Sequence, residues 1–311
     1  MALKIKMVIL VTGASGFLGS ALIPRLLEKG HTIYGLSRHP PEGKENLGPL
    51  IGDITEPDLG LEDVPGGIGS IYHLAAIHRL GENKADEIWQ TNVGGTINVI
   101  EFCKKYEIPH LFFISTSFTQ GRNSYERSKA YCEWMVANSS IPRVTIFKPS
   151  IIMGTPQHFY PGHFSQFVAL VIKVHQRAEM LRRWLEGKAR LPVIEPVFRL
   201  SANPGGKLNM VPIDVVASAM ADIDKPGTYW LTHPEPPTIG QLLEWLGQFI
   251  MVRVQIEAQF SNPSPPELVF HKMAAAFEPY LWGDNFPSDI KECPPITKEF
   301  INQIITKILL T

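Results

Sequence analysis

Short apolar runs alternate with longer stretches of helical periodicity over residues 4–149 of the chain. The apolar runs have the length of strands and cover residues 7–12, 31–37, 70–76, 110–116 and 143–149. Helix-period stretches lie between several of them, over residues 18–30, 94–106 and 125–137. Strands and helices in alternation favour right-handed crossover connections, and near-continuous apolar strands are typical of burial on both faces. The pattern therefore predicts an α/β fold with a doubly wound parallel sheet.

The regular alternation ends after Pro149, where proline and glycine become frequent. One long amphipathic pattern follows over residues 163–186. Its apolar residues stand at helical spacing, at Phe164, Phe167, Val168, Val171, Ala178, Leu181 and Leu185. We expect a first domain over residues 1–150 and a second, smaller region over residues 151–311 that is partly interleaved with the first.

Three glycines, Gly13, Gly16 and Gly19, stand between the first apolar run and the first helical stretch. A glycine turn at this point lets the backbone come close to a pyrophosphate. The helix that follows offers unpaired N–H groups and the positive end of its dipole. A glycine triplet alone is weak evidence, but its place between a strand and a helix predicts a nucleotide-binding site.

Composition and charge narrow the class of partner. Hydrophobic residues make up 44% of the 311 residues and charged residues 19%, which fits a globular protein with a large buried fraction. The net charge is -1 and no long run of Lys and Arg occurs, so we expect a small-molecule partner rather than nucleic acid or an anionic membrane. Cys103, Cys132 and Cys293 are far apart, and we expect neither a disulfide framework nor a metal site. Without a run of roughly 18–20 uncharged apolar residues, the sequence predicts no membrane span, and we expect a cytoplasmic protein.

The glycine spacing is G-x-x-G-x-x-G, and the segment TGASGFLG at residues 12–19 resembles the glycine motif of the extended short-chain dehydrogenase/reductase superfamily. Further segments resemble motifs of that branch in the same order, with G-D-I at residues 52–54, H-L-A-A at residues 73–76 and T-N-V-G-G-T at residues 91–96. The resemblance implies a Rossmann-type fold that binds NAD or NADP, followed by a smaller C-terminal substrate domain. It implies cofactor contacts at Gly13, Ser15, Gly16, Phe17, Leu18, Ser37, Arg38, Asp53, Ile54, Leu74, Ala75, Ala76, Asn92, Tyr125, Lys129, Pro149 and Ser150.

The end of the second apolar run bears on the choice between NAD and NADP. An enzyme that selects NAD normally carries an Asp or Glu about 20 residues past the glycine loop, where the carboxylate binds the ribose 2′-hydroxyl. This chain carries Ser37 and Arg38 there. A guanidinium can pair with a 2′-phosphate, which a carboxylate would repel. We therefore expect NADP(H) rather than NAD(H), against the alternative that Arg38 is a solvated loop residue.

The stretch NSYERSKA, residues 123–130, contains a tyrosine four residues before a lysine. A free tyrosine has a pKa of about 10, so it needs help to move a proton near neutral pH. Lys129 lies one helical turn after Tyr125 on the same face, and we expect its charge to lower the pKa of the phenol. Upstream motifs in the expected order favour Tyr125 and Lys129 as the catalytic pair, with Lys129 also bonding the nicotinamide ribose.

A third donor is expected at the end of the apolar run at residues 110–116, where the resemblance implies a Ser or Thr that polarises the substrate carbonyl. Successive side chains of a strand alternate faces, so Thr116 and Ser117 cannot both do this in a regular strand. Sugar-nucleotide members favour Ser117 and thioester-reductase members favour Thr116, and both stay candidates. The loop from Ser117 to Tyr125 is shorter than extended members usually carry, which predicts a more open approach to Tyr125 or cover from the second region.

The second half of the sequence contains motifs that indicate the class of substrate. Lys148, Pro149 and Ser150 resemble the R-P-[GS] element that touches the nicotinamide carboxamide. The V-P-I-D element at residues 211–214 and the stretch at residues 191–207 are most similar to the male-sterility branch, which comprises fatty acyl reductases and thioester reductase domains of carrier-protein systems. The resemblance implies NADPH-dependent reduction of a carbonyl or an acyl thioester, the latter presented on a carrier protein. The apolar pattern at residues 163–186 would then wall an acyl channel, although such a stripe is more often plain core.

Two other functions fit parts of the pattern. A nucleotide-sugar epimerase or dehydratase would retain bound NAD, and Arg38 speaks against it. A non-catalytic NADP-sensing scaffold commonly lacks the catalytic tyrosine or lysine, whereas this chain keeps both Tyr125 and Lys129. The resemblance leaves a homodimer open.

Overall fold

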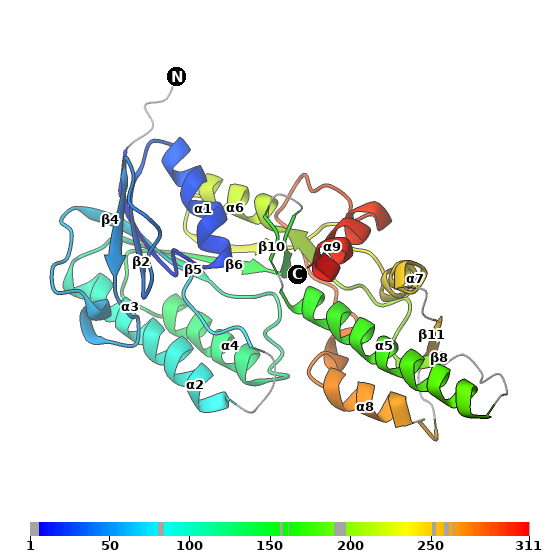
Figure 1. Ribbon diagram of the computed structural model, residues 1–311. Coiled ribbons are helices and arrows are strands. Elements are labelled where there is room, and N and C mark those ends of the chain that lie inside the picture. Colours follow the sequence, from blue (N-terminus) through cyan, green and yellow to red (C-terminus); the bar gives the residue numbers. More distant parts are fainter. Residues whose placement is uncertain are drawn as a thin grey trace. The chain divides into compact units, whose positions relative to one another are not determined.

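Figure 1 shows the computed structural model of the chain. It describes residues 6–79, 84–155, 158–160, 162–189, 197–250, 253–257, 261–263 and 265–310. Residues 191–196, part of the stretch that is similar to the male-sterility branch, therefore lie outside the described residues. The chain divides into two compact units. The first unit comprises Met1–Ser150, Val211–Thr232 and Pro287–Lys291, and the second comprises Ile151–Met210, His233–Phe286 and Glu292–Thr311.

A seven-stranded parallel sheet forms the centre of the first unit, in the order β10-β6-β5-β4-β1-β2-β3. Its strands cover Val8–Thr12 (β1), Thr32–Ser37 (β2), Leu47–Ile51 (β3), Ile68–His73 (β4), His110–Ile114 (β5), Arg143–Pro149 (β6) and Gly227–Leu231 (β10). The order reverses at β1, which pairs with both β2 and β4. Ligands of such sheets bind at the carboxyl ends of the strands beside this reversal. The α/β class with a doubly wound parallel sheet, predicted from the alternation, is confirmed.

Helices cover both faces of this sheet (Figure 1). One face carries α1 (Phe17–Glu28) and α6 (Ile213–Asp222), and the other carries α2 (Ala85–Trp89), α3 (Gly95–Lys105) and α4 (Ser124–Ala137). Arg25 of α1 holds α6 through Asp214 at 3.3 Å and the Ser218 hydroxyl at 2.8 Å. The short helices η1 (Pro57–Gly60) and η2 (Gln90–Gly94) complete the unit, and η2 is a π-helical turn between α2 and α3.

Buried aromatic side chains hold the middle strands of the first unit in place. Every residue of β5 is buried, and Phe113 is fully so. The Tyr72 ring of β4 stacks on Phe112 of β5 with 4.1 Å between ring centroids. Packing of buried aromatic side chains from adjacent strands fixes the strand ends. The polar residues that directly follow these strand ends are therefore held in place as well.

The second unit is mainly helical. Its helices are α5 (His163–Ala189), α7 (Ile239–Ile250), α8 (Pro265–Ala274), the 3-10 helix η3 (Glu278–Trp282) and α9 (Lys298–Leu310). A small sheet of β8 (Val197–Ser201) with β11 (Arg253–Glu257) accompanies them. The short strands β7 (Ile151–Met153) and β9 (Met210–Pro212) lie where the chain passes from one unit to the other. Arg199 of β8 binds the buried carboxylate of Glu267 in α8 at 2.9 Å, which ties sheet and helix together.

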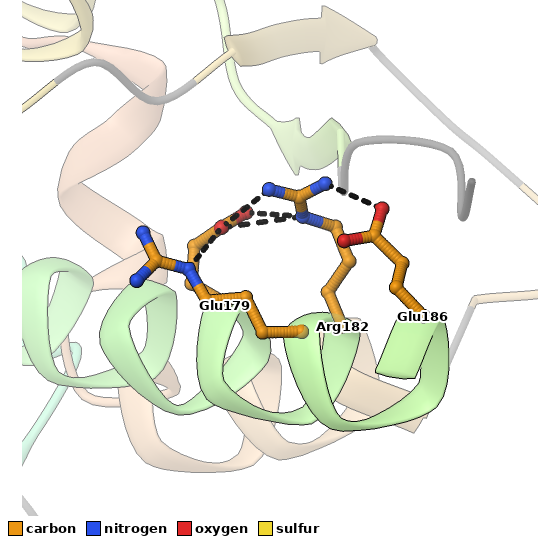
Figure 2. Close-up of polar contacts among 4 residues, drawn as sticks. Glu179, Arg182 and Glu186 are labelled. Carbon is orange, nitrogen blue, oxygen red and sulfur yellow. Dashed lines mark hydrogen bonds and ion pairs between the residues drawn. The ribbon is translucent and has the colours of Figure 1, made fainter. Parts of the chain in front are cut away.

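The helix predicted from the pattern at residues 163–186 is confirmed as α5. Phe167, Val168 and Val171 are buried in the core of the second unit, whereas Leu185 is exposed. Arg182 binds Glu179 and Glu186 on the neighbouring turns of α5 at 2.9 and 2.8 Å (Figure 2). The apolar side of α5 is therefore core packing, and its charged side is held by pairs within the helix.

Within the described parts of the chain, no helix combines the length and the apolar character that crossing a membrane needs. The cytoplasmic location stays a prediction.

Candidate active site

The glycine loop lies directly after β1 and is in close contact with the residues that follow β4. Gly13 has a φ of +71°, and a Cβ at this position would stand 2.8 Å from the backbone N of Ala75. Only glycine fits such an approach without strain. Gly19 is equally confined, because its Cβ would lie 2.6 Å from the carbonyl oxygen of Gly13. The loop therefore brings backbone N–H groups and the N-terminus of α1 to the carboxyl edge of the sheet, as a pyrophosphate site requires.

The end of β2 meets the same loop. The Ser15 hydroxyl donates to the Ser37 hydroxyl at 3.1 Å, which joins the loop to the last residue of β2. Phe17 and Leu18 are half-buried at the first turn of α1. Arg38 follows β2 and is exposed, and among the described residues no hydrogen bond or ion pair to its side chain is found. Its guanidinium is thus available at the place where the sequence predicts a 2′-phosphate.

Asp53 and Ile54 follow β3. Oδ1 of Asp53 accepts hydrogen bonds from the backbone N and the hydroxyl of Thr55, at 2.9 and 2.8 Å. Ile54 is buried, and its carbonyl accepts from Asn98 of α3 at 2.8 Å. The turn of Asp53 is therefore fixed against α3, and the second carboxylate oxygen is left for other contacts.

The H-L-A-A segment follows β4 and is tied to β1 by Thr12. The backbone N of Leu74 donates to the Thr12 carbonyl, and that of Ala75 to the Thr12 hydroxyl, both at 3.3 Å. His73 bridges Thr12 at 2.8 Å and Thr96 of α3 at 3.2 Å. Burial, together with the charge of Lys129, lowers the pKa of His73 to about 3. His73 is therefore a neutral bridge that holds the segment in place, with Ala76 half-buried at its end.

Asn92 lies in η2, and its side chain joins three segments. Its carboxamide accepts from the backbone N of Ile77 at 2.8 Å and donates to the Ile77 carbonyl at 2.9 Å. It also donates to the Ser128 hydroxyl at 2.9 Å, which in turn donates to the Tyr125 carbonyl at 2.8 Å. A π-helical turn redirects side chains relative to an α-helix and is often found at functional sites. These bonds join η2 to the segment after β4 and to the first turn of α4.

Tyr125 lies in the first turn of α4. The helix begins with Asn123, whose side chain accepts from the backbone N of Glu126 at 2.9 Å and caps the helix. Burial raises the pKa of Tyr125 to about 12, while a hydrogen bond with the Thr116 side chain acts in the opposite direction. Lys129 is not among the groups that shift this pKa, so the expected lowering by the lysine was wrong. At neutral pH the phenol keeps its proton.

Lys129 points to the end of β5 instead. Its ammonium group donates to the Ile114 carbonyl at 2.5 Å and lies 4.9 Å from the centre of the Phe113 ring. Burial lowers the pKa of Lys129 to about 8, while the neighbouring Cys132 raises it. The strand end therefore anchors the lysine at the site, and its charge is close to titrating at neutral pH.

Thr116 and Ser117 take different environments after β5. Thr116 is the partner of Tyr125, whereas the backbone N of Ser117 donates to the Pro149 carbonyl at 2.8 Å. The hydroxyl of Ser117 is buried and, among the described residues, has no hydrogen-bond partner. The same holds for the hydroxyl of Ser150, directly after β6. Two orphaned buried hydroxyls on adjacent strand ends fit a site completed by a polar group from outside the chain.

The structure thus brings the glycine loop, Ser37 and the H-L-A-A segment together at one end of the sheet, and joins Asn92, Thr116 and Tyr125 in one network. The close glycine turn and the orphaned hydroxyls fit a dinucleotide, and we regard the predicted residue types as compatible with it. Sequence reasoning missed the bridge of His73 and the link through Ser128. Ser128 could have been noticed from its place inside the Y-x-x-x-K spacing, whereas the contacts of His73 come from segments distant in the sequence.

The sequence was compared with protein families. The model of the NAD dependent epimerase/dehydratase family matches residues 9–194. A 2-alkyl-3-oxoalkanoate reductase of Stenotrophomonas maltophilia is 39% identical over 113 residues, which cover 35% of this chain and 33% of the reductase. The chain thus matches about a third of the length of that relative, and both reductases and epimerases occur among the relatives matched in this way.

Solved structures share the fold. The terminal R domain from the myxalamid PKS-NRPS pathway has a TM-score of 0.71 at 19% identity, covering 98% of this chain and 91% of that domain. A thiolation-reductase di-domain from an archaeal non-ribosomal peptide synthetase has a TM-score of 0.69 at 17% identity, covering 98% of this chain and 75% of that one. At these identities the likeness concerns the fold, and it confirms the expected Rossmann-type architecture. On the match over residues 9–194, the chain belongs to the NAD dependent epimerase/dehydratase family, whose members use a nicotinamide dinucleotide, and the resemblance to extended short-chain dehydrogenases/reductases is confirmed.

Proposed function

We propose that the protein is an NADPH-dependent reductase of a carbonyl or acyl-thioester substrate, with Tyr125 as the proton donor. The observation that carries the proposal is the position of Tyr125 in the first turn of α4, in contact with Thr116 after β5 and one helical turn before Lys129, whose buried ammonium group is bonded to the Ile114 carbonyl. A reduction needs a proton for the oxygen that gains negative charge, and a neutral phenol supplies one. The names of the relatives agree with a reduction, since one is an oxoalkanoate reductase and one a thiolation-reductase di-domain.

In this proposal the bound nicotinamide supplies the hydride to the carbonyl carbon. The turn at Gly13 and the N-terminus of α1 bind the pyrophosphate, and Asp53 and Ile54 lie against the adenine. Arg38 binds the 2′-phosphate and sets the preference for NADPH. The Ser150 hydroxyl, which has no hydrogen-bond partner among the described residues, and the neighbouring Pro149 would hold the carboxamide.

Two side chains polarise the substrate oxygen. The Tyr125 phenol donates its proton to that oxygen, and the Thr116 hydroxyl shares the hydrogen bond and keeps the phenol oriented. Lys129 stays positively charged below its pKa of about 8, is held at the Ile114 carbonyl, and would hydrogen-bond the nicotinamide ribose. Thr116 is thus the third catalytic donor in our proposal, and the buried Ser117 hydroxyl a cofactor or substrate contact.

The class of substrate follows from analogy and needs a direct test. We propose an acyl thioester on a carrier protein as the first candidate, because a terminal R domain and a thiolation-reductase di-domain are among the solved structures that share the fold. The experiment follows NADPH consumption with an acyl thioester, the matched aldehyde, a ketone and a nucleotide sugar. Oxidation of NADPH in the presence of the thioester or the aldehyde supports the proposal. Oxidation of NADPH with the ketone alone would indicate a ketone substrate in place of an acyl thioester.

Tyr125→Phe separates chemistry from binding, because it removes only the phenolic oxygen. Turnover should fall by on the order of 100-fold or more, the usual contribution of a positioned acid, with NADPH affinity retained. Tyr131→Phe on the exposed side of the same helix is the matched control and should keep full activity. Unchanged turnover in Tyr125→Phe would reject the mechanism. No turnover in the wild-type protein, with NAD retained through purification, would instead favour an epimerase or a sensing role.

A further inference from the structure

Glu133 stands one helical turn after Lys129 and two turns after Tyr125 on α4. Side chains four residues apart share one side of a helix, so Glu133 faces the same strand ends as the proposed catalytic pair. Its carboxylate accepts from the Ser115 hydroxyl at 2.7 Å and from the Lys148 ammonium group at 2.8 and 2.7 Å. One carboxylate therefore joins α4 to the ends of both β5 and β6.

The residues that Glu133 binds are direct neighbours of the proposed site. Ser115 precedes Thr116, the partner of Tyr125, and it follows Ile114, whose carbonyl anchors Lys129. Two successive residues at the end of β5 are thus held by two successive turns of α4. The distance between Thr116 and Tyr125 is set by this double attachment.

Lys148 extends the same link across the sheet. Its side chain is almost entirely buried, with 6% exposed, and its ammonium group lies 4.9 Å from the centre of the Trp230 ring of β10. A buried ammonium group needs a compensating charge, and Glu133 supplies it. Lys148 also precedes Pro149 and Ser150, so the ion pair fixes the strand end that carries the orphaned Ser150 hydroxyl.

We propose that Glu133 is a positioning residue, which holds the carboxyl ends of β5 and β6 against α4 so that Thr116 stays in hydrogen-bond contact with Tyr125. This inference rests on the proposed function, because it assigns Glu133 to the reaction of Tyr125. Glu133 touches neither reacting group and acts through Ser115 and Lys148.

Ser115→Ala is the main test, because it removes one bond to Glu133 and leaves the ion pair with Lys148 intact. The matched control is Ser70→Ala, which deletes a buried strand hydroxyl that has no hydrogen-bond partner among the described residues. Four quantities are measured in both variants: kcat, KM for NADPH, amide hydrogen exchange over residues 115–118, and the thermal midpoint. Glu133→Met combined with Lys148→Met is a second variant, which removes the bonds of the carboxylate to both Ser115 and Lys148 without leaving a buried unpaired charge.

Ser115→Ala should lower kcat by on the order of tenfold, because a small misplacement of a catalytic group has a large effect on rate. KM for NADPH should stay within about twofold, since binding is not the step affected. Exchange at residues 115–118 should become faster than in Ser70→Ala, and the double variant should behave in the same way. If either kcat or exchange in Ser115→Ala equals that of Ser70→Ala, the positioning role is overturned. If wild-type protein reduces no substrate, the proposed function fails, and exchange alone then decides whether Glu133 holds the strand end.

Discussion

Replacing Gly13 with alanine tests whether the close approach of the glycine loop to β4 is required, and Gly30 offers a matched comparison. Both glycines have positive φ, +71° at Gly13 and +85° at Gly30. A Cβ on Gly30 would have no atom within 4 Å, whereas one on Gly13 would meet backbone N of Ala75 at 2.8 Å and its Cα at 3.0 Å. Both variants therefore place an alanine in a backbone conformation with positive φ, but only Gly13→Ala also brings its Cβ against backbone atoms.

The magnitudes follow from these two terms. A left-handed conformation costs an alanine about 1–2 kcal/mol, which applies to both variants. Overpacking against backbone atoms adds about 1–3 kcal/mol at Gly13 alone. For a domain of this size, each kcal/mol shifts the thermal midpoint by about 2–4 °C. Gly13→Ala should therefore unfold roughly 2–12 °C below Gly30→Ala.

Cofactor affinity gives the second reading of the same pair. Gly13→Ala displaces Ala75, which the sequence places in the cofactor site, so the Kd for NADPH should rise by at least about tenfold, equivalent to about 1.4 kcal/mol. Gly30→Ala lies at the far end of α1 and should keep the wild-type Kd. Thermal unfolding and quenching of NADPH fluorescence measure the two quantities. Equal midpoints and equal Kd values in the two variants would refute the role of the close contact.

Three further results are expected from the site. Arg38→Ala should weaken NADPH binding far more than NADH binding, while Arg183→Ala at another exposed arginine should change neither; equal losses for both nucleotides would contradict recognition of the 2′-phosphate. Thr116→Val should lower kcat by about 10- to 100-fold, whereas Ser117→Ala should act mainly on KM; the reverse order would make Ser117 the catalytic donor. Burial lowers the pKa of Lys129 from 10.5 in the unfolded chain to about 8, so the unfolded chain binds more protons between these values and stability should rise with pH there. Lys129→Met should remove that rise, by up to roughly 3 kcal/mol, and identical pH slopes from urea denaturation would show that Lys129 is not buried as a cation.

The strands that the sequence predicted are marked by the local pattern of apolar residues, whereas the strands that it missed are not. The strand β5 was readable because all of its residues are buried, which makes the run continuously apolar. The strand β3 escaped prediction, since it lies at the sheet edge with alternating exposure and contains Gly48 and Pro49. The strand β10 escaped for another reason. It pairs with β6 although about 80 residues separate the two in the sequence, and no local pattern specifies a pairing over that distance.

At the site, too, the sequence predicts some features and misses others. The four-residue spacing of Tyr125 and Lys129 places both on one side of α4, and this much is fixed by helix geometry. The direction of the Lys129 ammonium group is decided by the open carbonyl of Ile114 at the end of β5, a partner that the spacing cannot show. Because the lysine is held there, burial dominates the pKa of Tyr125 and raises it. The pattern thus identified the two residues but not the sign of the pKa shift of Tyr125, which depends on how deeply the folded chain buries the phenol.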